Sequence, residues 1–103
     1  SLERIAELTA TNPARIMGLG GRKGAIAPGL DADLAVVDPG ARWTVTRGGV
    51  HSSAGYSIYE GWELTGRVVH TLVRGRFALR DGGLAPDAVG TGRYLRRERP
   101  GRA

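Results

Sequence analysis

Three aspartates lie close together in GAIAPGLDADLAVVD, residues 24–38. Asp31, Asp33 and Asp38 could present carboxylate oxygens to a hard cation such as Mg²⁺ or Ca²⁺. A calcium loop, however, needs more oxygen ligands in a fixed order, and the rest of an EF-hand pattern does not follow here. The stretch therefore favours structural roles, in which the carboxylates support a turn, begin a strand and end that strand, respectively.

The sequence contains two histidines, His51 and His70, so it cannot by itself supply a three-histidine metal site. His70 falls in a predicted strand, whereas His51 lies in a Gly- and Ser-rich loop, the better place for a ligand or a general base. Ser52 and Ser53 follow His51, but adjacent residues rarely reach the geometry of a serine–base pair, and no orienting acid is evident. We therefore assign no catalytic, cofactor-binding or metal-ligating residue in this sequence.

Glycines surround two basic residues in GLGGRKG, residues 18–24, a pattern that resembles a phosphate-binding loop. The stretch follows a predicted helix rather than a strand, and it lacks the Gly-Lys-Ser/Thr ending of such loops. The glycines instead predict the end of a helix.

Basic residues are concentrated at the C-terminal end, where residues 93–103 carry +4 of the formal net charge of +5. This segment has no interleaved aromatic residues beyond Tyr94, so we expect a solvated tail and no nucleic-acid partner. The aromatic residues elsewhere are predicted to pack rather than to stack on bases. The tail arginines are Arg93, Arg96, Arg97, Arg99 and Arg102.

The length of 103 residues limits the chain to one small domain with a thin core. The absence of cysteine excludes a disulfide-stapled secreted domain and a Cys-based zinc site. No apolar run approaches the roughly 20 residues of a membrane span, and the first residues do not form a signal peptide. We therefore expect a cytoplasmic protein with no membrane partner. Because the sequence opens SLERIAEL without Met, we also expect a piece of a longer chain.

The periodicity of the sequence changes from helical to strand-like near residue 24. Ser1 and Asn12-Pro13 are typical helix starts, and Arg74-Gly75 is typical of a hairpin turn. Because these few strands cannot close a barrel, the order of the predicted helices and strands indicates an α+β fold, mainly β, that lacks its other half. The predicted elements are helices at 2–9 and 13–17, strands at 25–26, 33–38 and 42–46, a long loop at 47–63, and a hairpin with strands at 68–73 and 77–79.

Three stretches in this order resemble the C-terminal end of the cyclic amidohydrolases, the family of allantoinases, dihydropyrimidinases or hydantoinases, and dihydroorotases. They are LTATNPARIMGL (8–19), KGAIAPGLDADLAVVDP (23–39) and YSIYEGWELTGRVVHTLVRGR (56–76). The resemblance covers almost the whole chain. The third stretch looks most like allantoinase.

The resemblance implies a TIM barrel that carries the active site and a small β-sandwich beside it, built from both chain ends. Residues 1–22 would be terminal helices of the barrel. Residues 23–85 would form part of the sandwich, with the long loop 47–63, and residues 86–103 would be a basic tail. The implied fold is therefore one or two N-terminal helices followed by part of a β-sandwich.

The reaction that the resemblance implies is hydrolytic opening of a cyclic amide or ureide. In such enzymes two divalent metals, typically zinc, are held by histidines, an aspartate and a carbamylated lysine, and they activate a hydroxide. None of those ligands is matched here, so we expect no cofactor in this chain and no activity from it alone. The expected partners are the rest of the barrel and further copies of the chain, joined through exposed strand edges.

Two other functions stay open at this point. The chain could be a self-associating β-rich assembly module without catalytic activity. It could also be a basic nucleic-acid binder, in which case deletion of residues 93–103 should abolish the binding.

Overall fold

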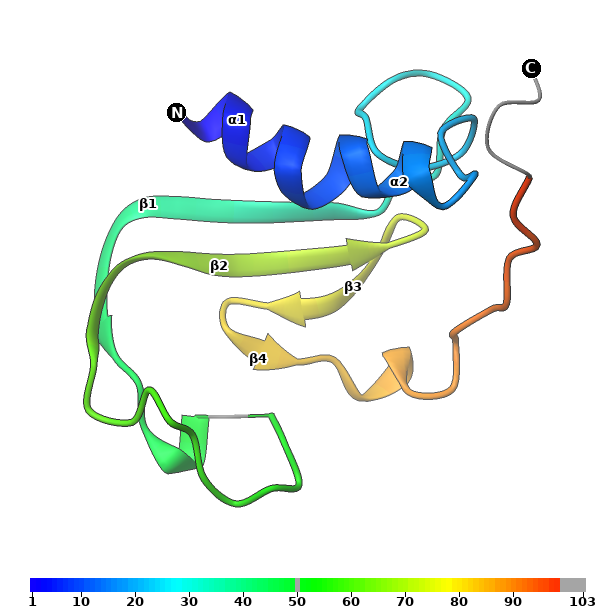
Figure 1. The fold of residues 1–103 in the computed structure, drawn as a ribbon. Coiled ribbons are helices and arrows are strands. Elements are labelled where there is room, and N and C mark those ends of the chain that lie inside the picture. Colours follow the sequence, from blue (N-terminus) through cyan, green and yellow to red (C-terminus); the bar gives the residue numbers. More distant parts are fainter. Residues whose placement is uncertain (50, 99–103) are drawn as a thin grey trace.

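The computed structural model describes residues 1–49 and 51–98. A helical segment lies along one side of a four-stranded antiparallel sheet with strand order β1-β2-β3-β4 (Figure 1). This arrangement confirms the α+β, mainly β fold class. The elements are α1 (Leu2–Ala6), the π-helical turn η1 (Glu7–Thr11), α2 (Asn12–Ile16), β1 (Leu34–Thr44), the 3₁₀ turn η2 (Arg47–Gly49), β2 (Glu63–Val73), β3 (Arg76–Arg80), β4 (Gly83–Leu84) and the 3₁₀ turn η3 (Pro86–Ala88).

The N-terminal helical segment is continuous from α1 through η1 to α2. The Ser1 side chain accepts a hydrogen bond of 3.2 Å from the Arg4 amide, which confirms the predicted N-cap. Asn12 has helical dihedral angles, φ −67° and ψ −46°, so the second N-cap predicted there is wrong. The two predicted helices form one.

The π-helical turn explains how Pro13 is accommodated inside this helix. The Asn12 amide donates to the Glu7 carbonyl, five residues earlier. A proline inside a regular helix lacks a donor and clashes with the preceding turn, and a wider turn relieves that crowding. Pro13 therefore does not start a new helix.

Strand β1 merges two predicted strands into one, and the break expected at Pro39 is a bulge. Between Asp38 and Arg42 the pairing with β2 shifts, so that β1 contains extra residues there. The Asp38 carboxylate accepts a hydrogen bond of 3.0 Å from the Gly40 amide. A bulge tolerates proline because it needs no donor to the neighbouring strand.

Two tight turns order the rest of the sheet. Arg74 and Gly75 have φ values of 49° and 79°. A two-residue hairpin turn of this type requires positive φ at both positions, so these angles confirm the predicted hairpin. Asp81 and Gly82 repeat this conformation and lead into β4, which was not predicted.

The segment between the helix and β1 is irregular, so the strand predicted at 25–26 is wrong. Its Pro-Gly turn is as expected, because the Leu30 amide donates to the Ala27 carbonyl at 3.2 Å and Gly29 has a φ of 90°. Its hydrogen bonds include one within the segment, from the Asp31 amide to the Arg22 carbonyl at 2.9 Å, and one from the helix, from the Thr11 hydroxyl to the Gly24 carbonyl at 2.8 Å.

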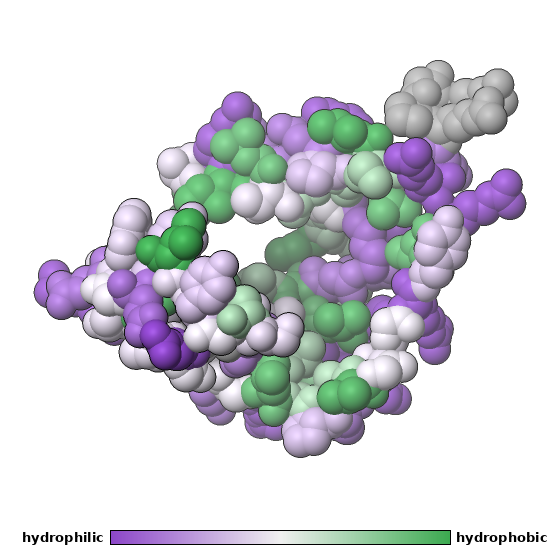
Figure 2. Space-filling view, turned by 60° about the horizontal axis from the view of Figure 1, so that its bottom comes forward, coloured by the Kyte–Doolittle hydropathy of each residue, from purple (hydrophilic) through white to green (hydrophobic). Residues whose placement is uncertain are grey.

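The hydrophobic core is very small. Among the described residues, only Ala14 and Val45 are buried hydrophobic residues. The radius of gyration is 15.7 Å, against about 13 Å for a compact domain of this length. Figure 2 accordingly shows hydrophobic residues on the surface, around an open hollow. In the described part of the chain, no helix is long and apolar enough to cross a membrane.

Candidate functional site

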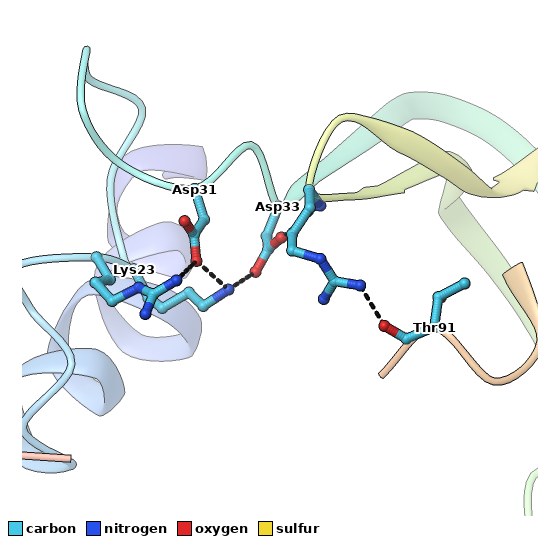
Figure 3. A network of polar contacts seen from close by, with 6 residues as sticks. Lys23, Asp31, Asp33 and Thr91 are labelled. Atoms are coloured by element: carbon cyan, nitrogen blue, oxygen red, sulfur yellow. Dashed lines mark hydrogen bonds and ion pairs between the residues drawn. The ribbon is translucent and has the colours of Figure 1, made fainter. Parts of the chain in front are cut away.

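The most extensive set of polar contacts centres on Lys23, in the irregular segment after the helix (Figure 3). The Lys23 ammonium lies 2.9 Å from an Asp31 oxygen and also contacts the Asp33 carboxylate. The Arg22 guanidinium approaches Asp31 at 3.4 Å. We call Lys23, Asp31 and Asp33, together with Arg74 and Thr91, the Lys23 cluster.

Asp33 connects this segment to the hairpin turn between β2 and β3. Its other carboxylate oxygen accepts a hydrogen bond of 2.8 Å from the Arg74 amide. A second bond of 2.9 Å runs from the Gly75 amide to the Ala32 carbonyl. The Arg74 side chain then donates to the Thr91 carbonyl in the tail (Figure 3). The Lys23 cluster therefore joins three segments that are distant in the sequence.

The charges in the cluster shift one another's pKa values. The hydrogen bond from Lys23 lowers the pKa of Asp33, and the Arg74 amide lowers it further. The hydrogen bond from Lys23 likewise lowers the pKa of Asp31. The hydrogen bonds to Asp33 and then Asp31 raise the pKa of Lys23. All three groups are thus held in their charged forms, which suits a structural ionic contact and not proton transfer at neutral pH.

The cluster is important because the backbone of the helix does not come close to that of any strand. In the described part of the chain, no Cα atom of the helical segment lies within 8 Å of a Cα atom in any strand. The hydrogen bonds that connect the helical end of the chain to the sheet run through the segment that contains Lys23 and through the tail. Asp33 has the structural role that the sequence indicated, at the start of β1.

The histidines lie apart and do not form a site together. His51 is exposed, and the described residues contain no hydrogen bond between it and Ser52 or Ser53. The Ser52 hydroxyl instead accepts from the Ala54 amide at 3.2 Å. This geometry is a local turn and not a nucleophile–base pair.

His70 has a structural role at the turn between β3 and β4. Its Nδ1 accepts a hydrogen bond of 3.1 Å from the Asp81 amide, which places the ring proton on Nε2. The ring packs edge-on against Phe77, with 5.6 Å between the ring centres. No local pattern predicts this contact, because the turn that aligns Asp81 with His70 was not predicted to lead into a further strand.

The tail is attached to the helix end rather than wholly solvated. The Glu98 amide donates to the Gly18 carbonyl at 3.0 Å, and an Arg97 nitrogen lies 4.0 Å from the Met17 sulfur. The glycine-rich stretch 18–24 thus serves as a packing surface. Arg99 and Arg102 lie outside the described residues.

Residues 1–49 and 51–98 contain no group of three His, Asp or Glu side chains that could hold a metal ion. The described residues therefore do not fit the two-metal centre that the resemblance implies for the barrel. The contacts that they do show hold the loop after the helix, the hairpin turn and the tail in position relative to one another.

Comparison with known proteins gives the family. Residues 1–78 match the sequence profile of the Amidohydrolase family. The chain belongs to the amidohydrolase family. The D-phenylhydantoinase of Escherichia coli O1:K1 / APEC is 43% identical to this amidohydrolase chain over 98 residues, which are 95% of the chain and 21% of that relative.

Solved structures agree with this family. The crystal structure of dihydropyrimidinase from Brevibacillus agri NCHU1002 superposes with a TM-score of 0.92 at 34% identity, covering 100% of this amidohydrolase chain and 22% of that protein. The D-hydantoinase (dihydropyrimidinase) from Thermus sp. gives a TM-score of 0.78 at 40% identity, over 82% of this chain and 19% of that one. The amidohydrolase chain therefore spans about a fifth of the length of its relatives.

Proposed function

We propose that the chain is the C-terminal, non-catalytic portion of a cyclic amidohydrolase, and that it packs against the catalytic part of that enzyme. The observation that carries this proposal is the match of the whole chain, at a TM-score of 0.92, to 22% of a dihydropyrimidinase. In this proposal residues 1–22 are barrel helices, residues 23–85 are a sandwich portion with the loop 47–63, and residues 86–103 are a tail.

The proposed parent reaction is hydrolytic opening of a cyclic amide or ureide. We propose two divalent metals, zinc with a carbamylated lysine, as the parent's hydroxide-activating group. Their ligands would lie in the catalytic part, since the described residues of this chain offer no three-ligand cluster. This chain's own contribution is structural, through the Lys23 cluster and the apolar surfaces.

A chimera tests this proposal directly. The segment of the Escherichia coli D-phenylhydantoinase that matches this chain is replaced by residues 1–103, and hydrolysis of a hydantoin is measured. We expect a folded, active enzyme, whereas the same hydantoinase without the segment should be inactive or insoluble. A chimera that folds and binds metal but does not turn over the hydantoin would contradict the proposal. Turnover by the isolated chain with added zinc would contradict its non-catalytic character.

The substrate of the parent is a second part of the proposal. The run YEGWELTGRVV (59–69) resembles allantoinase, while the relatives described above are named hydantoinases and dihydropyrimidinases. We propose a five- or six-membered cyclic ureide as substrate. The test is to assay the full-length protein that carries this segment with hydantoin, dihydrouracil and allantoin, and with succinimide as a cyclic imide that lacks the ureide group. A protein that opens only a ring without the ureide group would overturn this choice.

Self-association is a second candidate function, favoured by the exposed edge of the sheet. Strand β1 is an edge strand of 11 residues, and Val36 and Val37 in it are 43% and 47% exposed. Long exposed edges with apolar residues readily pair with another chain. We expect the isolated chain to form dimers or larger species in light scattering, and Val36→Lys to shift it to monomers. A wild-type chain that is strictly monomeric would exclude this function.

A further inference from the structure

A groove of about 470 Å³ lies between β3 and the tail, away from the helix. Only the second half of β3 pairs with β4, since that pairing involves Leu79 and Arg80. The first half of β3 instead faces the segment around Thr91 across the groove. The groove is thus an open space between two backbone segments, of a size that suits a small molecule.

The lining of the groove is strongly basic. Three arginines, Arg74, Arg76 and Arg93, line the groove, against one acidic residue, Asp87. Within residues 1–49 and 51–98, none of these four side chains takes part in an ion pair. The bond from Arg74 to the Thr91 carbonyl holds that guanidinium at the groove. A positive site with one fixed and two available arginines is therefore present.

We propose that this groove binds the phosphoryl group of a small phosphorylated molecule. Arginine forks bind phosphate oxygens in pairs, and a phosphoryl group has enough terminal oxygens for three arginines, whereas one carboxylate does not. The lining carries a surplus of two positive charges, which matches a dianion. The volume exceeds that of phosphate alone, so the groove also has room for the organic part of the ligand, beside apolar lining residues such as Val73 and Ala88. This inference goes beyond the proposed function and does not depend on it.

Calorimetric titration with inorganic phosphate and with phenyl phosphate tests this site, at roughly physiological ionic strength so that distant charges are screened. The titrations use the full 103-residue chain and, in parallel, the chimeric hydantoinase, so that a chain unstable alone still gives a reading. We expect both ligands to bind, phenyl phosphate more tightly. Arg76→Gln and Arg93→Gln should each weaken binding about tenfold or more, because each removes a charge-assisted hydrogen bond.

Arg96→Gln is the matched control, because it removes one charge from the same tail without altering the lining of the groove. It should change the affinity by less than about twofold. Gly92→Glu, which places a carboxylate at the groove, should abolish binding. An equal loss with Arg96→Gln and Arg93→Gln would show diffuse attraction to a basic chain and would overturn the proposal. Succinate binding as tightly as phosphate, or no binding of phosphate, would overturn it as well.

Discussion

At the scale of single residues, Lys23 is the position on which most contacts depend, since it contacts two aspartates that are 21% and 32% exposed. Lys23→Met leaves these two carboxylates near each other with only the Arg22 guanidinium, 3.4 Å from Asp31, as a remaining cationic partner. We expect a loss of about 1 kcal/mol in the free energy of unfolding, because partly exposed ion pairs contribute little each but two are lost. Chemical denaturation measures it.

Arg22→Met is the control for this experiment. Arg22 is 55% exposed and lies 3.4 Å from Asp31, so its removal should cost clearly less than that of Lys23. An Arg22→Met variant as unstable as Lys23→Met would mean that general charge, and not the Lys23 contacts, stabilises the fold.

The pKa shifts in the cluster give a pH dependence with a definite sign. Asp31 and Asp33 have lowered pKa values, so their contribution is present above about pH 4 and is lost as the pH falls through the lowered values. Lys23 has a raised pKa, so its contribution is present below its ordinary pKa and is lost as the pH rises through the raised value. The stability difference between wild type and Lys23→Met should therefore be flat near neutrality and vanish in strong acid. A constant difference down to about pH 2 would contradict this account.

The sequence predicted the roles of single residues only in part. Asp33 and Asp38 have structural roles, as the turn and strand signals around them indicated. The importance of Lys23 could not be predicted, because its partners lie 8 to 10 positions further on and meet it only after the Pro-Gly turn has folded back.

At the scale of elements, the loop after the helix depends on Gly24. Gly24 has a φ of 96°, and a Cβ there would lie 2.8 Å from the Ala14 Cβ. Gly24→Ala should therefore destabilise the chain by about 2 to 3 kcal/mol, through both backbone strain and a clash with the helix. Thermal unfolding followed by circular dichroism measures this loss.

Gly29→Ala separates these two causes. Gly29 has a similar φ of 90°, but a Cβ there meets nothing within 4 Å. Its replacement should cost only the backbone term, about 1 kcal/mol. Equal losses for the two variants would show that the contact between Gly24 and Ala14 does not matter.

The two breaks that were predicted at prolines, within the helix and within β1, are absent for one shared reason, which is that the surrounding structure overrides the local signal. Pro13 and Pro39 are strong breakers, yet a π-helical turn and a bulge let the helix and β1 continue past them. Strand β4 follows the Asp81-Gly82 turn, which is as clear a turn signal as Arg74-Gly75. It was missed because only two residues pair there.

At the scale of the whole molecule, the dominant property is uncovered surface. The accessible area is 8406 Å², whereas a compact protein of this mass exposes about 5,600 Å². The difference exceeds the roughly 800 Å² that each partner buries in a standard interface. The sequence predicted this incompleteness from the small number of strands, since they cannot enclose a core.

The apolar side of the helix allows a test at this scale. Ile5 and Leu8 are 57% and 54% exposed. The double change to serine should alter the free energy of unfolding of the isolated chain by less than about 0.5 kcal/mol, because it removes few internal contacts. In the chimeric hydantoinase the same change should greatly reduce the yield of folded enzyme. The control is Leu84→Ser, at a residue 64% exposed on the short strand β4.

Equal sensitivity of the isolated chain and the chimera to the Ile5 and Leu8 changes would mean that the catalytic part does not cover the helix. If Leu84→Ser and the helix changes reduced the yield of the chimera equally, the apolar side of the helix would be no more important for folding than another exposed apolar residue.

The bond between the Glu98 amide and the Gly18 carbonyl has a consequence for biosynthesis. The two segments that it joins are about 80 positions apart in the chain. A ribosome therefore releases the helix long before the residue that fastens its end has been translated. Until then no residue of the tail holds the end of the helix, and its position rests on the loop that follows it.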